Sequence, residues 1–362
     1  MSLMQNRAAC CVVWLLAGPS FFLGSALAQD ATPEDDTINT IRQLAQISVS
    51  DQRRIADWVQ GQVDKLPATP DSDRQSASVA FRKKFKGQYE NQANTPPFRA
   101  QLAAQTATVA VAQLGDLKLD PGVAFALARV LVDMERDRVE TLPGLLAGLR
   151  SRHEAARYLC AEGLSAPKAA IAADKAKLDE AVDALKKAAL AETSPIVLGR
   201  IYLALAHGNQ VPAVLDAYLA IFDKRLGDRR GGAVAADGAE VEAFEFFRSA
   251  GVLAALNADQ KAQVTSRLAV FLRLDAERYK TTGIDFYELD RLERMMDSVE
   301  ALLAELAGPT AKGGKIREEL AAGGQDRRAE ILAEAYKWVG HPQSKEPGAL
   351  NPPPSNVPIG AP

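Results

Sequence analysis

The sequence predicts an all-α fold, and three observations support this prediction. Alanine, the residue with the highest helix propensity, accounts for 64 of the 362 residues, whereas aromatic residues make up only 6%. Runs in which β-branched or aromatic residues alternate strictly with polar ones, as in half-buried strands, are nearly absent. Apolar residues instead recur at spacings of three and four residues between helix-capping signals. We therefore expect about a dozen helices joined by short loops.

The N-terminal segment has the pattern of a cleavable secretory signal. Arg7 supplies positive charge, Cys11–Leu23 is largely apolar, and Ala26 and Ala28 are the small residues that signal peptidase requires. Because the apolar segment is shorter than the roughly 20 residues of a transmembrane helix, we expect a signal peptide over residues 1–28, cleaved after Ala28, and not a retained anchor. The mature chain is then expected in the periplasm or outside the cell, with no stable membrane span.

The charge and cysteine content of the mature chain limit the kinds of partner and covalent link that we expect. Losing one of the 43 basic residues leaves 42 against 46 acidic ones, a formal net charge of −4. Nucleic-acid-binding proteins normally carry a basic excess, so we expect no nucleic-acid partner. Cys160 is then the single cysteine and cannot form an intramolecular disulfide. It lies in an apolar stretch and is predicted to be buried, not reactive.

Residues 29–96 are expected to form N-terminal helices, and the ends of helices along the chain are marked by capping residues. Asp120–Pro121 and Ser194–Pro195 place a capping side chain before a proline, and Asn257 with Gln260 has the spacing of a capping box. Glycines mark the expected helix ends: Gly115, Gly208, Gly227, Gly308 and Gly340. The glycine-rich residues 227–239 are expected to form an exposed loop.

An internal similarity recurs in the middle of the chain. Helical segments in which an arginine is followed by small and aliphatic residues contain Arg157 and Arg200, which are 43 residues apart. Arg248 follows 48 residues later, and Arg129 precedes them in a similar segment. Such periods are typical of repeat proteins that stack pairs of helices.

These segments resemble the HEAT and armadillo-like repeat superfamily, whose period is about 40 to 47 residues. The resemblance covers about residues 97–280. It implies an irregular α-solenoid of stacked helix pairs that bury a continuous core between neighbours. The interval of 28 residues between Arg129 and Arg157 departs from this period, so an irregular helical bundle is the alternative fold.

The C-terminal helices, expected over residues 281–340, contain a regular apolar seam. Its spacing alternates between three and four residues over nearly three heptads: Leu289, Leu292, Met296, Val299, Leu303 and Leu306. We expect this helix to pack against the end of its own chain, with assembly of an oligomer through the seam as the alternative. Residues 341–362 contain seven prolines and are expected to be a disordered tail.

No motif indicates a catalytic, cofactor-binding or metal site, and we assign no residue to such a site. His153, His207 and His341 lack metal-ligand spacing. Gly308–Ile316 is glycine-rich but lacks the lysine and hydroxyl residues of a phosphate-binding loop, so we expect a flexible linker.

Two charged segments need consideration. Glu240, Glu242 and Glu245 lie near three phenylalanines, and Glu242 with Glu245 could form a carboxylate pair on one helix face. The basic run Arg82–Lys86 could contact an anionic surface. For each segment we expect a solvated helix face instead.

We therefore expect an exported, non-catalytic binding or scaffold protein whose solenoid surface contacts a protein or an envelope polymer. Two alternatives stay open. One is a glycan-acting enzyme of the helical-barrel type that uses carboxylates without a linear motif. The other is a structural oligomer assembled through the 289–306 helix.

Overall fold

All regular secondary structure in the described part of the chain is helical, which confirms the predicted all-α class. The computed structural model describes residues 33–66, 73–165, 171–206, 211–231, 238–249, 251–281, 283–323, 327–341 and 348–350. The predicted signal peptide, Gly208 and most of the proline-rich tail lie outside these residues. No helix within the described ranges is long and apolar enough to cross a membrane.

The helices are short to medium in length and follow one another closely. Their bounds are α1 (Pro33–Ile41), α2 (Val49–Asp64), α3 (Arg74–Tyr89), α4 (Pro96–Leu114), α5 (Pro121–Asp133), η2 (Glu135–Asp137), α6 (Arg138–Gly148), α7 (Glu154–Ser165), α9 (Lys175–Ala191), α10 (Pro195–Leu205), α11 (Val211–Arg230), α12 (Val241–Arg248), α13 (Val252–Ala255), α14 (Ala258–Lys280), α15 (Phe286–Ala307), α16 (Ile316–Ala321) and α17 (Arg328–Val339).

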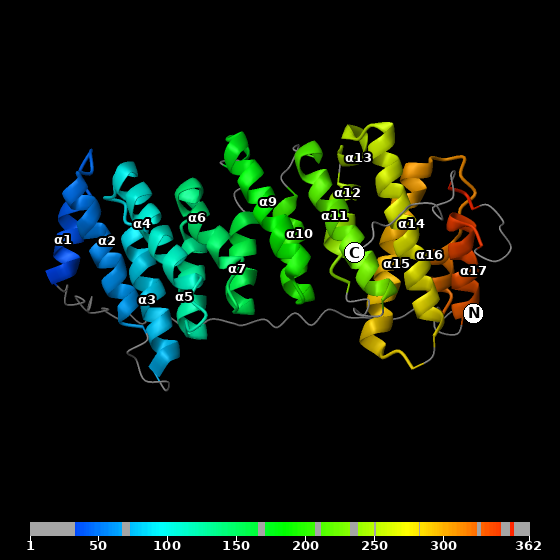
Figure 1. Cartoon of the computed structure of the whole chain (residues 1–362), viewed down its shortest axis with the longest axis horizontal. Coiled ribbons are helices and arrows are strands. Elements are labelled where there is room, and N and C mark those ends of the chain that lie inside the picture. The colour runs from blue at the N-terminus through cyan, green and yellow to red at the C-terminus, as the bar shows by residue number, and fades with distance from the viewer. Residues whose placement is uncertain are drawn as a thin grey trace, which may run out of the picture.

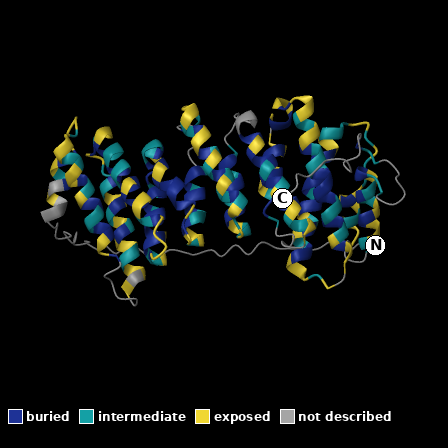
Figure 2. Cartoon of the chain, viewed as in Figure 1, coloured by how far each residue is buried: buried dark blue, intermediate teal, exposed yellow. Residues whose placement is uncertain are grey.

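The helices pack as two rows that run the length of an elongated molecule (Figure 1). In the first row, α2, α4, α6, α9, α11, α14 and α17 each contact the next member. In the second row the same holds for α3, α5, α7, α10, α12, α15 and α16. Buried residues line the space between the rows (Figure 2), and they form one continuous hydrophobic core from Ile38 to Leu350.

The predicted caps explain several helix starts. Asp120 Oδ1 accepts hydrogen bonds from the backbone N–H groups of Gly122 and Val123, at 2.8 and 3.2 Å. Ser194 caps α10 in the same way, and Asn257 and Gln260 form the expected capping box at the start of α14. These bonds satisfy backbone donors that the first helical turn leaves without intrahelical partners, which confirms the predicted starts.

Three of the glycines predicted to mark helix ends do so, and a fourth lies inside a helix. Gly115, Gly308 and Gly340 are the C-caps of α4, α15 and α17. Gly227, however, lies inside α11, which continues to Arg230. The prediction of a helix end at Gly227 was wrong because buried contacts of Leu226 and Arg229 on either side offset the low helix propensity of glycine.

The apolar seam of α15 is buried against other helices of the same chain. Leu289, Leu292, Met296, Val299 and Leu303 are buried, Leu306 is half-buried, and α15 packs against α12 and α14. The expectation that this helix packs on its own chain is therefore confirmed. In this structure the seam offers no free apolar face to a second copy, so it does not support the alternative of assembly through the seam.

The glycine-rich segment before α16 is tightly packed, which corrects the expectation of a flexible linker. A side chain at Gly313 would overlap the ring of Trp338, and one at Gly314 would overlap the carbonyl of Glu334. The predicted tail also contributes to the fold at one point. Leu350 is buried, and its N–H donates a hydrogen bond to the carbonyl of Trp338 at 3.2 Å.

Replacing Gly148 by alanine is expected to lower the free energy of unfolding by about 2 kcal/mol. The added Cβ would overlap the buried sulfur of Cys160 and lie 3.3 Å from Leu114 Cδ1, where α6 meets its neighbours. Gly87→Ala is the matched control, because a Cβ at Gly87 meets nothing within 4 Å and alanine favours the helix by about 0.5 kcal/mol. Urea denaturation measures both effects.

Cys160→Ala should restore most of the stability that Gly148→Ala loses, because it removes the overlapping sulfur atom. If Gly148→Ala were as stable as Gly87→Ala, the close approach of α6 and α7 at this point would be contradicted.

Candidate functional site

The four arginines of the predicted repeat lie on successive helices of the second row. Arg129, Arg157, Arg200 and Arg248 belong to α5, α7, α10 and α12, and each of these helices packs against the next. Each of these arginines therefore lies one helix further along the second row than the one before it.

Three of these arginines connect one step of the row to another. The Arg129 guanidinium lies 3.8 Å from Glu162 of α7, and Arg157 Nε donates to Glu192 at 2.8 Å. Arg200 Nε donates to the hydroxyl of Tyr158 at 2.7 Å. Arg248 pairs within its own helix instead. The first three arginines thus help to fix the spacing of neighbouring helices. Because all four have partners within the chain, they leave little uncompensated charge for a ligand.

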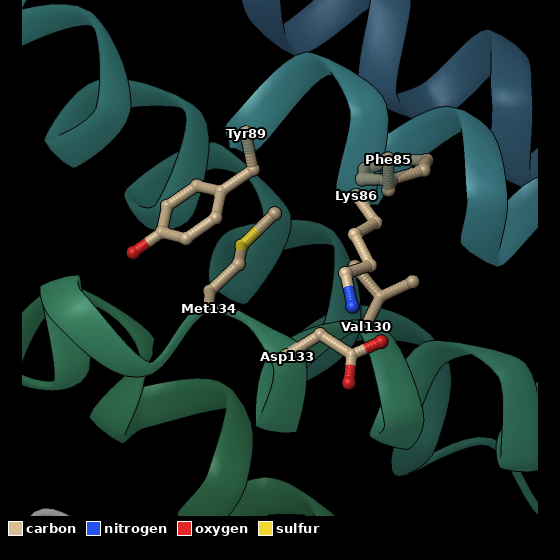
Figure 3. Close-up of a pocket in the computed structure, with 6 residues that line it drawn as sticks. All are labelled: Phe85, Lys86, Tyr89, Val130, Asp133 and Met134. Carbon is tan, nitrogen blue, oxygen red and sulfur yellow. The ribbon is translucent and has the colours of Figure 1, made fainter. Parts of the chain in front are cut away.

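A hollow lies where α3 and α5 end, beside η2. The pocket drawn in Figure 3 has an apolar floor that includes Phe85, Val130 and Met134. An adjoining polar hollow of about 220 Å³ shares three of its residues and is lined by both charge signs: Lys86, Tyr89, Glu90, Asp133, Glu135 and Arg136. The lining comes from two segments more than 40 residues apart, so no local pattern of residues signals it.

Two acidic groups beside this hollow, Asp133 and Asp137, have basic or hydroxyl partners. Asp133 accepts hydrogen bonds from Arg82 at 2.5 and 3.1 Å, and the Arg129 guanidinium lies 3.5 Å away. The Tyr89 hydroxyl donates to Asp137 at 2.7 Å, and burial together with this carboxylate raises the pKa of Tyr89. Such an arrangement holds α3 against α5 and engages the carboxylates of Asp133 and Asp137 in contacts within the fold.

The basic run Arg82–Lys86 does not form one charged surface. Arg82 points to Asp133, the Lys84 ammonium lies 5.9 Å from the ring centre of Trp58, and Lys86 lies 3.7 Å from Glu90. Lys83 is exposed. Because the charges diverge to three neighbours, the run lacks the single basic face that an anionic polymer would need.

Carboxylates near the start of α12 divide into two kinds. Glu242 and Glu245 are exposed, which confirms the predicted solvated face. Glu240 is completely buried and pairs with Arg225 and Arg229. Sequence reasoning missed this cluster because Arg229 lies in residues 227–239, which were expected to form an exposed loop, and because Glu240 was expected on a solvated helix face.

Cys160 and the two histidines in the described part of the chain, His153 and His341, contact neighbouring groups of the fold. Cys160 is buried, as predicted, and burial raises the pKa of its thiol to about 12. His153 contacts the carbonyl of Leu119 at 2.8 Å, the ring of His341 lies 4.7 Å from that of Tyr336, and His207 lies outside the described residues. Within the described ranges, no three His, Cys, Asp or Glu side chains gather closely enough to hold a metal ion.

Comparison with protein-family models, with curated proteins and with solved structures found no match to this chain. The fold and its surfaces are therefore the basis for any functional proposal.

Proposed function

We propose that the chain is an α-solenoid of the HEAT-like type and acts after export as a non-catalytic scaffold that binds a protein partner along its surface. The observation that carries this proposal is the two-row packing, in which each helix contacts the corresponding helix of the next pair. In a solenoid this arrangement leaves a long surface accessible on each row.

Helix spacing supports the same proposal. The second-row helices α3, α5, α7, α10, α12 and α15 begin at residues 74, 121, 154, 195, 241 and 286. Most of these steps fall near the period of about 40 to 47 residues of HEAT repeats. The shorter step from α5 to α7 contains the irregular interval already visible between Arg129 and Arg157.

The second row is the better candidate for the contact surface. It carries exposed large apolar side chains on four of its helices: Val79, Phe125, Ile196, Phe286 and Tyr287. Among the residues whose side chains the structure describes, the first row carries two, Val49 and Val111. Exposed aromatic and aliphatic side chains are the usual anchors of protein–protein contacts.

The test compares two matched pairs of substitutions. Phe125→Asp with Ile196→Asp changes the second row, at side chains that are 44% and 65% exposed. Val111→Asp with Val49→Asp changes the first row, at side chains that are 43% and 65% exposed. Each double variant serves as bait in a cross-linked pull-down from native envelope fractions, with quantitative mass spectrometry as the readout.

We expect the second-row variant to lose at least about tenfold of a reproducible protein partner, and the first-row variant to retain it. Thermal melting checks that both variants remain folded. Recovery of bait alone from wild type would contradict the scaffold function, and equal losses in both variants would contradict the choice of the second row.

A further inference from the structure

One of the four arginines of the predicted repeat differs from the others in the charge of its partner. Arg129 and Arg157 pair with carboxylates of neighbouring segments, and Arg248 pairs with a carboxylate of its own helix. Arg200 instead donates from Nε to the neutral hydroxyl of Tyr158 at 2.7 Å. No ion pair joins Arg200 to an acidic group in the part of the chain that the structure describes, so its charge is the exception to the compensation along the row.

The guanidinium of Arg200 is held in a defined orientation between α7 and α10. Its Cζ atom lies 5.0 Å from the ring centre of Tyr158, so the ring and the hydroxyl contact the guanidinium together. Its two terminal nitrogens have no hydrogen-bond partner among the described residues, and neither nitrogen is buried. A guanidinium held in this way keeps its outer edge free for the two oxygens of a carboxylate.

Aliphatic side chains flank this cation on the outer face of α10. Ile196 lies four residues before Arg200 and Leu203 lies three residues after it, so all three share one face of the helix. Ile196 is 65% exposed, and Leu203 is half-buried. The face therefore combines a positive charge that lacks a carboxylate partner with apolar surface on both sides of it.

Most acidic groups that border this face are engaged in other contacts. Glu154 accepts a hydrogen bond from the side chain that caps α10, while Glu162 and Glu192 pair with arginines of α5 and α7. Glu242 of α12 is exposed and lies beside Gly199, but no ion pair of the described residues joins it to the guanidinium. Its negative charge would weaken the binding of an external carboxylate, so removing that charge should strengthen such binding.

We propose that this face, the Arg200 site (Tyr158, Ile196, Arg200 and Leu203), binds a segment of a partner protein that presents a carboxylate beside an aliphatic side chain. The carboxylate accepts hydrogen bonds from both terminal nitrogens of the guanidinium, and the aliphatic side chain covers the apolar surface of α10. The inference rests on the proposed scaffold function and specifies the chemistry of the partner. An anionic polymer without apolar groups would match the charge but leave the aliphatic side chains exposed to water.

An array of synthetic peptides with blocked ends tests the Arg200 site with the full chain in solution. The peptides form matched pairs that differ at one position, glutamate or glutamine, with leucine three and four residues away. We expect wild type to bind the glutamate members at least about tenfold more tightly, because the carboxylate makes charge-assisted hydrogen bonds. Replacing the leucines with serine should weaken binding by a similar factor.

Two results from the array would contradict the proposal. The absence of a preference for glutamate in wild type, whether both members of a pair bind or neither does, would overturn the carboxylate contact. Equal binding of the leucine and serine peptides would show a site for anions in general and would overturn the choice of a protein segment.

Four variants show whether the preference for glutamate arises at this site. Arg200→Gln should remove it, whereas Arg248→Gln, at an arginine of the same row that is 37% exposed, is the matched control and should retain it. Glu242→Gln should increase the preference. Tyr158→Phe removes the hydroxyl that orients the guanidinium, so it should reduce the preference while the binding of glutamine peptides stays unchanged.

Thermal melting checks that each variant remains folded, and the effects of Glu242→Gln and Tyr158→Phe do not require Arg200→Gln to fold. A preference that survives Arg200→Gln, or that Glu242→Gln and Tyr158→Phe both leave unchanged, would overturn the proposal.

The peptide array needs no native partner, so its result is separate from that of the pull-down. Recovery of bait alone in the pull-down would contradict the scaffold function. Equal recovery of a native partner by wild type and by Arg200→Gln would overturn the present inference and leave the scaffold function standing.

Discussion

Arg138→Met is expected to lower the free energy of unfolding by about 3 kcal/mol. The Arg138 guanidinium is buried and donates to the carbonyls of Leu131 and Val132 at the end of α5, where a helix leaves carbonyl groups without intrahelical partners. Methionine fills similar volume but cannot donate, so both carbonyls would lose their partner. Urea denaturation followed by far-ultraviolet circular dichroism measures the loss.

The neighbouring residue provides the control for this prediction. Arg136 lies on η2 and is exposed, so Arg136→Met should change stability by less than about 0.5 kcal/mol. Arg138→Lys should fall between the two, because one ammonium cannot match the fork of a guanidinium. Burial lowers the pKa of Arg138, yet arginine remains protonated across the usual pH range, so its contribution should not depend on pH. Equal stability of Arg136→Met and Arg138→Met would contradict this account.

Glu300→Ala is expected to cost about 3 kcal/mol and to loosen α16 and α17. The Glu300 carboxylate accepts hydrogen bonds from the backbone N–H groups of Ile316 and Arg317 at 2.7 and 2.8 Å, and from Trp338 Nε1 at 3.1 Å. It therefore caps the N-terminus of α16 and fixes the indole against α15. Without the carboxylate, three donors lose their partner together.

Tryptophan fluorescence localises this effect, because Trp58 and Trp338 lie at opposite ends of the row. In a background carrying Trp14→Phe and Trp58→Phe, which leaves Trp338 as the single tryptophan, Glu300→Ala should shift the Trp338 emission to longer wavelength before global unfolding. Glu305→Ala, an exposed site on the same helix, should leave emission and stability unchanged. Unchanged emission in Glu300→Ala would show that the indole is held by packing alone.

Local sequence was sufficient for the helices whose signals lie within a few residues. The caps at Asp120, Ser194 and Asn257 act on backbone groups two or three residues away, so their spacing is enough to predict them. The seam of α15 was equally clear, because apolar residues at alternating three- and four-residue spacing form one face of a helix.

Local sequence failed where a distant segment sets the environment. Gly227 was predicted to end a helix, but α11 continues past it because Arg229, in its last turn, donates a hydrogen bond to Asp275, which is 46 residues away. The Gly308–Ile316 segment looked flexible, but its glycines are required where Trp338 and Glu334 of α17 approach its backbone. The hollow beside Tyr89 likewise depends on α5, and no motif near Tyr89 indicates it.

The sequence by itself determined the helical class, the helix starts at Asp120, Ser194 and Asn257 and the apolar face of α15, because these depend on propensity and on spacing within one helix. Only the tertiary structure decided which charges are buried, as at Glu240 and Arg138, and which glycines permit close contact. The physical reason is that a charge or a glycine has no fixed role in isolation. Its role depends on whether the fold places water, an opposite charge or another backbone beside it.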